Sequence, residues 1–249
     1  MNNELMLICG QDIPFPQAKI TIHQPTIKEI SYIGEEAFYT GCEMLRITKE
    51  NLNIEDKVNL EEWSNFDILM SILRENNASI KHNKTCVMLL LSLLFPTHLI
   101  KIDKNKILLT SIENNEESFI DNNNFNDFLD ILNSMFDHGD KNSEKEYNPQ
   151  GKLSKRIADK LKERQKKLLE LKKKPEKIAV LSRYISILAV AENKDINILK
   201  NYTVFQLLDE FKRYELKTSF DAYMKAALAG VKDLKQVDDW MEDIHPNLK

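Results

Sequence analysis

The stretch Lys152–Lys177 reads KLSKRIADKLKERQKKLLELKKKPEK, and the organisation of the whole chain is built around it. It holds 12 Lys and Arg residues against 4 Asp and Glu residues, a local charge of +8. The rest of the 249-residue chain holds 23 basic and 35 acidic residues, a net charge of −12. Charge is therefore segregated, with one cationic segment between an acidic N-terminal part and an acidic C-terminal part.

A helix is predicted within this stretch, because Ile157, Leu161 and Leu168 recur at spacings of four and seven. Pro175 ends it. The remaining faces are cationic, and the candidate partner-binding residues on them are Lys155, Arg156, Lys160, Arg164, Lys166 and Lys167. Two interpretations stay open: a solvated helix between two domains, or a docking surface for an acidic partner. Nucleic acid is disfavoured as that partner, because no aromatic side chain lies among these charges to stack on bases.

Composition restricts the class of protein. Only 6 Gly are present, and neither G-x-G-x-x-G nor G-x-x-x-x-G-K occurs, which argues against nucleotide-binding loops. The three cysteines, Cys9, Cys42 and Cys86, are scattered and odd in number, which indicates buried thiols in a reducing cytoplasm. The N-terminus lacks a basic signal-peptide region, and the apolar run Cys86–Phe95 is too short for a membrane span. We therefore expect a soluble intracellular protein with no membrane association.

No pattern in the sequence indicates catalysis or metal binding. None of the five His residues forms H-x-x-x-H or H-E-x-x-H. His82 and Cys86 share a helix face, but two ligands do not make a zinc site, and core packing is the favoured interpretation. Adjacent carboxylates diverge on a helix, and no G-x-S-x-G elbow is present. We expect no enzymatic activity, no cofactor and no metal.

Residues 1–137 are predicted to form an α-rich domain with short strands. The predicted strands are Leu5–Cys9, Ala18–Ile22, and a hairpin of Leu99–Ile102 with Ile107–Thr110. One helix begins at the capping box Thr26-Ile27-Lys28-Glu29 and runs past Ala37. Three more helices are predicted: one capped by Asn65, one at His82–Phe95, and one that starts near Asp121 and carries Phe125, Phe128, Leu129, Leu132 and Phe136.

Residues 138–177 are predicted to be a linker with the basic helix, and residues 178–249 a helical bundle. Ile178–Ala191 is apolar on nearly every side, so it is the predicted central helix of that bundle. A loop at Asn193–Asn201 and a second capping box, Thr203-Val204-Phe205-Gln206, follow. The later elements are a helix capped by Ser219 and closed by Gly230, and a last helix at Lys235–Glu242. The predicted fold class is mainly α, with an α-rich α+β N-terminal part and a helical C-terminal bundle.

Aromatic residues gather towards the end of the chain: Tyr202, Phe205, Phe211, Tyr214, Phe220, Tyr223 and Trp240. Aromatic side chains carry much of the buried area of small bundles, so a core is the favoured interpretation. A groove for a partner is the alternative.

Several short stretches resemble tail-assembly proteins of long-tailed phages and prophages of low-GC Gram-positive bacteria. They are Ile22–Ile30 with Ile33-Gly34-Glu35, Leu94-Phe95-Pro96, Tyr147-Asn148-Pro149, Thr203–Phe211 and Asp238–Met241. The resemblance implies a tail assembly chaperone. Such a protein is non-enzymatic, works in the host bacterial cytoplasm and is absent from the finished virion. It keeps the tape-measure protein soluble while tail tube subunits polymerise around it.

The implied partners are the tape-measure protein and the tail tube protein, and a homo-oligomer is left open. The alternative function is a structural virion component of the neck, tail or baseplate. A third is a nucleic-acid-binding regulator that uses Lys152–Lys177. Detection in purified particles separates the first two, and binding to DNA or RNA that falls steeply with salt would favour the third.

Overall fold

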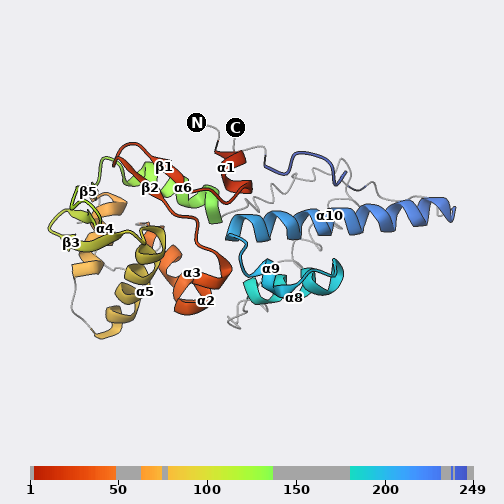
Figure 1. Ribbon diagram of the computed structural model, residues 1–249, viewed down its shortest axis with the longest axis horizontal. Coiled ribbons are helices and arrows are strands. Elements are labelled where there is room, and N and C mark those ends of the chain that lie inside the picture. The colour runs from red at the N-terminus through yellow and green to blue at the C-terminus, as the bar shows by residue number, and fades with distance from the viewer. Residues whose placement is uncertain are drawn as a thin grey trace, which may run out of the picture. The chain divides into compact units, whose positions relative to one another are not determined.

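The computed structural model describes residues 3–48, 63–74, 78–136, 180–230, 237 and 239–245 (Figure 1). The basic stretch Lys152–Lys177, the predicted linker Asp137–Gln150 and the predicted loop at 51–60 lie outside these ranges. The described residues between 3 and 136 and between 181 and 245 belong to one compact unit. The predicted domain boundaries after residues 137 and 177 stay predictions, because both positions fall outside the described residues.

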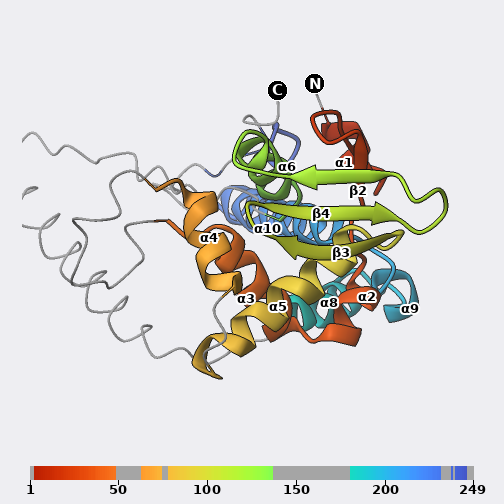
Figure 2. The same cartoon turned by 90° about the vertical axis from the view of Figure 1, so that its left-hand side faces the viewer.

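The fold is mixed α+β, so the predicted class, mainly α, is wrong. The described strands form two antiparallel sheets, β1 (Ile13–Phe15) with β2 (Ile20–Ile22), and the order β3 (His98–Asp103), β4 (Lys106–Ser111), β5 (Glu117–Ile120). Figure 2 shows the strands of the second sheet side by side. The β3–β4 hairpin was predicted correctly. The four-residue strand β5 was missed, because so short a run between turns has little periodicity of its own.

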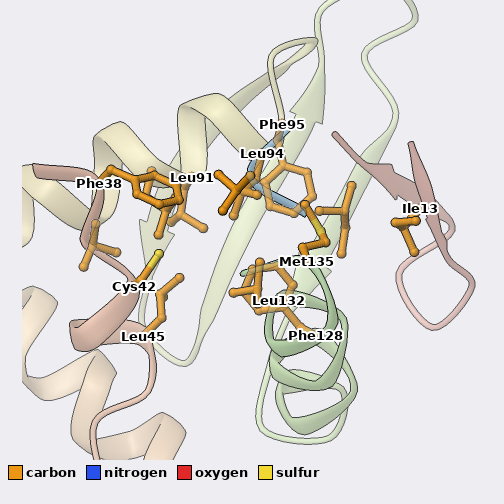
Figure 3. Packing of buried hydrophobic residues seen from close by; sticks show 14 of the residues in the cluster. Ile13, Phe38, Cys42, Leu45, Leu91, Leu94, Phe95, Phe128, Leu132 and Met135 are labelled. Carbon is orange, nitrogen blue, oxygen red and sulfur yellow. The ribbon is translucent and has the colours of Figure 1, made fainter. Parts of the chain in front are cut away.

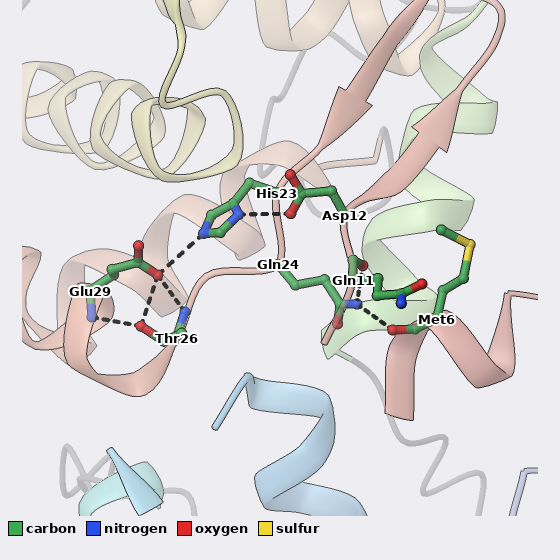
Figure 4. A network of polar contacts seen from close by, with 7 residues as sticks. All are labelled: Met6, Gln11, Asp12, His23, Gln24, Thr26 and Glu29. Atoms are coloured by element: carbon green, nitrogen blue, oxygen red, sulfur yellow. Dashed lines mark hydrogen bonds and ion pairs between the residues drawn. The ribbon is translucent and has the colours of Figure 1, made fainter. Parts of the chain in front are cut away.

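The first strand, β1, contains Pro14, which pairs with Thr21 of β2. A two-stranded ribbon has only edge strands, where the missing N–H donor of a proline is tolerated. The preceding segment is a helix, α1 (Glu4–Ile8), and not the predicted strand Leu5–Cys9. A five-residue apolar run fits either element, and tertiary contacts decide. Gln24 supplies one of these, since its Nε2 donates to the Met6 carbonyl at 3.1 Å, and it also donates to the Gln11 carbonyl after the helix at 2.6 Å (Figure 4).

The predicted capping box at Thr26 is confirmed, with reciprocal hydrogen bonds between Thr26 and Glu29. It opens α2 (Ile27–Ile33). The predicted continuous helix past Ala37 is interrupted at Gly34, whose φ of 87° lies in the left-handed region that favours glycine. A separate helix, α3 (Glu35–Leu45), follows.

Helices α4 (Asn65–Arg74) and α5 (Ala78–Leu94) agree with the predicted pair, and Ser64 caps α4 where Asn65 was predicted to do so. Helix α5 crosses α3 closely at Gly41. A Cβ at that position would lie 2.8 Å from the carbonyl oxygen of Cys86, so only glycine allows the approach.

Contacts between phenylalanine rings connect the elements that surround the hydrophobic core. Helix α6 (Phe125–Phe136) supplies Phe128, whose ring centroid lies 6.1 Å from that of Phe15 and 6.0 Å from that of Phe95. Phe136, in the last turn of α6, contacts Phe38 edge-on at 5.1 Å. Figure 3 shows α3, α5, β1 and α6 converging on this core.

The C-terminal helices are α8 (Val180–Ala191), α9 (Ile196–Leu199) and α10 (Val204–Leu228). Helix α8 was predicted to be a buried central helix, yet its buried residues are Leu181 and Leu188, and Val190 is 83% exposed. Its first turn is held from the N-terminal part, because Glu35 accepts a hydrogen bond from the Leu181 N–H at 2.7 Å. The predicted loop at Asn193–Asn201 contains α9.

Helix α10 is continuous, so the predicted second helix capped by Ser219 is wrong. The Ser219 side chain is exposed, and an exposed serine is tolerated within a helix. The predicted end at Gly230 is confirmed, with φ at 77°. The predicted last helix, Lys235–Glu242, is wrong in its described part, which forms turns. There Asp239 accepts a hydrogen bond from the Met241 N–H at 3.0 Å, a local contact that competes with helix.

Candidate functional site

A pocket of about 500 Å³ opens beside the first turns of α10. Its lining comes from segments far apart in the sequence: Ile8 of α1, Glu192 after α8, several residues between Tyr202 and Lys217, and Trp240. Trp240 belongs to the segment Asp239–His245, which we name the C-terminal strap. Figure 1 shows α1 beside the start of α10, with the strap in dark blue running nearby.

The first turn of α10 lines the pocket and is hydrogen-bonded to α1. Thr203 caps the helix by accepting from the Gln206 N–H, and Gln206 Oε1 accepts from the Thr203 N–H at 2.9 Å. The Nε2 of Gln206 then donates to the Ile8 carbonyl at 2.8 Å. This capping box was predicted, but its tether to α1 was not, and the tether is what places Ile8 at the pocket.

Aromatic side chains form the apolar lining. Phe205 is 1% exposed, and Tyr202, Tyr214 and Trp240 are half-buried beside it. Phe211 stacks on Tyr184 of α8 at 4.0 Å. Both interpretations of the aromatic cluster therefore apply in part. Phe205 belongs to the core, and the half-buried aromatic residues beside it line the pocket.

The carboxylates of the lining have side-chain partners within the chain. Lys194 pairs with Glu192 at 3.3 Å and with Oε1 of Glu210, and its ammonium lies 5.7 Å from the ring centroid of Tyr202. The second oxygen of Glu210, Oε2, is buried and has no hydrogen-bond partner among the described residues. Asp209 pairs with His245 of the strap at 2.7 Å.

The cationic groups of the lining are engaged differently. Arg213 Nη1 donates to the carbonyl oxygens of Trp240 and Glu242 at 2.8 and 2.6 Å, which are neutral acceptors. Lys217 lies one turn further along α10 and is exposed. Among the described residues, no carboxylate forms an ion pair with Arg213 or Lys217. The pocket therefore combines an aromatic lining with two positive charges that are not neutralised there.

The other sequence candidates have separate outcomes. His82 Nε2 lies 3.6 Å from the Cys86 sulfur, so the predicted shared helix face is confirmed. Within the described ranges, no three His, Cys, Asp or Glu side chains lie together in a group that could hold a metal ion. Burial raises the pKa of Cys42 to about 12, which keeps this thiol protonated and inert. Cys9 is exposed, so the prediction of three buried thiols is wrong for it.

The basic candidates Lys155, Arg156, Lys160, Arg164, Lys166 and Lys167 lie outside the described residues. The pocket itself was not predicted as a unit. The aromatic cluster was the available signal, but nothing local in the sequence links Ile8 or Glu192 to it.

A family model described as the YomV second domain matches residues 172–245, less than a third of the chain. That family is phage-derived, so the match indicates a phage or prophage origin. Apart from Ile8, every residue that lines the pocket falls within the matched segment. Neither the curated proteins nor the solved structures contain a match to the chain. Within the described part, no helix combines the length and the apolar character needed to cross a membrane.

Proposed function

We propose that the chain is a phage tail assembly chaperone. In this proposal it is non-enzymatic, acts in the host bacterial cytoplasm, and binds the tape-measure protein or tail tube subunits while the tail assembles. One observation carries the proposal: the segment that matches the phage-derived YomV second domain also builds nearly all of the aromatic pocket. A partner-binding role for this pocket fits the resemblance of the sequence to tail-assembly proteins.

The composition of the pocket supports recognition of a protein partner. Tyr, Trp and Arg are the residue types most enriched among binding hot spots, and Tyr202, Tyr214, Trp240 and Arg213 line the pocket together. A volume of about 500 Å³ is enough to take large side chains of a partner.

The basic stretch Lys152–Lys177 has a second part in the proposal, as a surface that steers an acidic partner towards the chain. Reversing Lys160, Lys166 and Lys167 to Glu should slow association and flatten its salt dependence, because steering charges act mainly on the association rate. Stopped-flow association at several salt concentrations measures this. Unchanged rates at low salt would mean that these charges have no part in binding.

The test of the proposed function is co-production of the chain with the tape-measure protein of the same phage. The chain should raise the soluble fraction of the tape-measure protein and should co-purify with it. Replacing Tyr214 and Trp240 by Ala should abolish both effects, because the apolar lining of the pocket is lost. Tyr32→Ala is the matched control, since Tyr32 is 76% exposed on α2 and does not line the pocket.

Two results would contradict the proposal. The first is a tape-measure protein equally soluble with and without the chain. The second is recovery of the chain from purified particles in fixed proportion to tail subunits, as measured by mass spectrometry, which would instead make it a structural component of the virion.

A further inference from the structure

Arg213 and Lys217 line the pocket, and no ion pair to either is found among the described residues, so these two cations indicate the chemistry of the partner. The three carboxylates of the lining, Glu192, Asp209 and Glu210, are engaged by Lys194 or His245. Arg213 and Lys217 lie four positions apart on α10, hence on one helix face. A ligand seated here meets two unneutralised cations beside an aromatic lining, so its own complementary group is an anion.

Exposed apolar side chains are also found on the elements that line the pocket. Ile8 is 45% exposed at its edge, and Leu5, one turn earlier on α1, is 71% exposed. Met241, next to Trp240 in the strap, is 68% exposed. A small molecule confined to the pocket would leave these side chains uncovered, whereas a macromolecular partner would cover them.

The elements around the pocket determine which backbone form can dock. The lining residues come from α1, α10, the turns around α9, and the strap, and none comes from a strand. An added strand needs a free sheet edge to pair with, and the lining offers none. A helix satisfies its own backbone hydrogen bonds. The residues from Gln206 to Lys217 extend over about 17 Å of α10, which is about three helical turns for a second helix to follow.

From these observations we propose that the pocket is a docking site for an acidic amphipathic helix. A large apolar side chain of that helix enters the aromatic lining, and an Asp or Glu about one turn away pairs with Arg213 and Lys217. The inference rests on the proposed function, because it names the chemistry of the partner for the same pocket.

The test uses the full chain and two synthetic peptides of about 20 residues, a length that supports a helix in water. Both peptides carry the same Leu and Phe stripe on an Ala-rich helix, and one has Glu where the other has Lys. Neither contains Trp, and the Trp63→Phe background leaves Trp240 as the fluorescent reporter, since the chain holds 2 Trp. The acidic peptide should bind about tenfold more tightly at low salt, and the difference should shrink as salt rises.

Two matched variants assign the effect to the pocket. Lys217→Glu should weaken binding of the acidic peptide about fivefold and strengthen binding of the basic one. Lys212→Glu makes the same charge change at an exposed position of α10 outside the lining, and it should alter either affinity by less than about twofold. The control is needed because the stretch Lys152–Lys177, with its charge of +8, is expected to attract acidic peptides as well.

Three results would overturn the inference: equal affinity for both peptides, equal effects of the two variants, or no response of Trp240 to either peptide. A chain that solubilises the tape-measure protein without this charge preference would refute the inference alone. A chain that shows the preference but has no effect on the tape-measure protein would refute the proposed function alone.

Discussion

Two capping boxes with the same spacing begin α2 and α10, and they lie side by side. Thr26 and Thr203 form an antiparallel bridge, and the N–H of Ile27 donates to the Tyr202 carbonyl at 2.9 Å. In the first box the third residue after the threonine is Glu29, and in the second it is Gln206. One motif therefore occurs twice in one place, once with a charged side chain and once with a neutral one.

The charged box acts locally. A single oxygen of Glu29, Oε2, accepts from the Thr26 N–H at 2.7 Å and the Thr26 hydroxyl at 2.8 Å, and it lies 3.3 Å from Nε2 of His23 (Figure 4). The other ring nitrogen of His23, Nδ1, lies 2.9 Å from Asp12.

The neutral box acts at long range. Gln206 accepts with its oxygen as Glu29 does, but its Nε2 also donates to the carbonyl of Ile8, 198 positions away in the sequence. A carboxylate has no proton to donate in this way at neutral pH. The comparison shows that a capping box can start a helix and also hold a distant segment. It does so here because the residue three positions after the threonine, Gln206, carries an amide that can donate as well as accept.

Replacing the amide of the second box by a carboxylate should have the largest effect on stability. Gln206→Glu keeps the cap but loses the donation to Ile8 and places a carboxylate against that carbonyl. We expect a loss of about 2 kcal/mol in the free energy of unfolding, and weaker binding at the pocket because Ile8 is released. Urea unfolding and the peptide assay measure the two effects. A loss below about 0.5 kcal/mol would mean that the tether does not stabilise the junction.

Removing each cap compares the two boxes directly. Thr203→Ala should cost about 1.5 kcal/mol, and Thr26→Ala about 1 kcal/mol, because Thr203 is only 4% exposed and starts the longer helix. The Thr→Ser variant at each position keeps the hydroxyl and should recover most of the loss. Thermal unfolding followed by circular dichroism gives both values, and a larger loss at Thr26 would reverse the proposed ranking.

The local part of this fold could be predicted from the sequence. Both capping boxes, the helix carried by Phe125 and Phe128, and the hairpin at Asp103–Lys106 were predicted because a few neighbouring residues determine each of them. Gly230 as a helix end belongs to the same class, since only glycine readily adopts the required backbone angle.

The remaining features depend on distant contacts. The segment Glu4–Ile8 is helical within a junction held by Gln24 and Gln206, neither of which is near it in the sequence. The pocket depends on Arg213 holding the strap by two backbone carbonyls, and no side-chain pattern encodes that contact. The aromatic cluster was visible in the sequence, but its division between core and pocket depends on these contacts.

The smallest effect should come from Glu29→Gln, which gives the first box the chemistry of the second. Burial raises the pKa of Glu29, but hydrogen bonds from the Thr26 N–H and hydroxyl and the contact with His23 outweigh it, so its pKa falls below the ordinary 4.5. The native carboxylate therefore contributes stability above pH 4.5, and that contribution disappears as pH falls through the lowered value. The variant should lose about 0.5 kcal/mol at pH 7, because the charge at the helix N-terminus is removed, and the loss should shrink as pH falls through the lowered pKa of Glu29. Urea unfolding across this range measures the difference, with Glu113→Gln in the exposed β4–β5 turn as a control for loss of one carboxyl. A difference that stays constant from pH 7 to pH 3 would mean that the charge of Glu29 does not contribute to its cap.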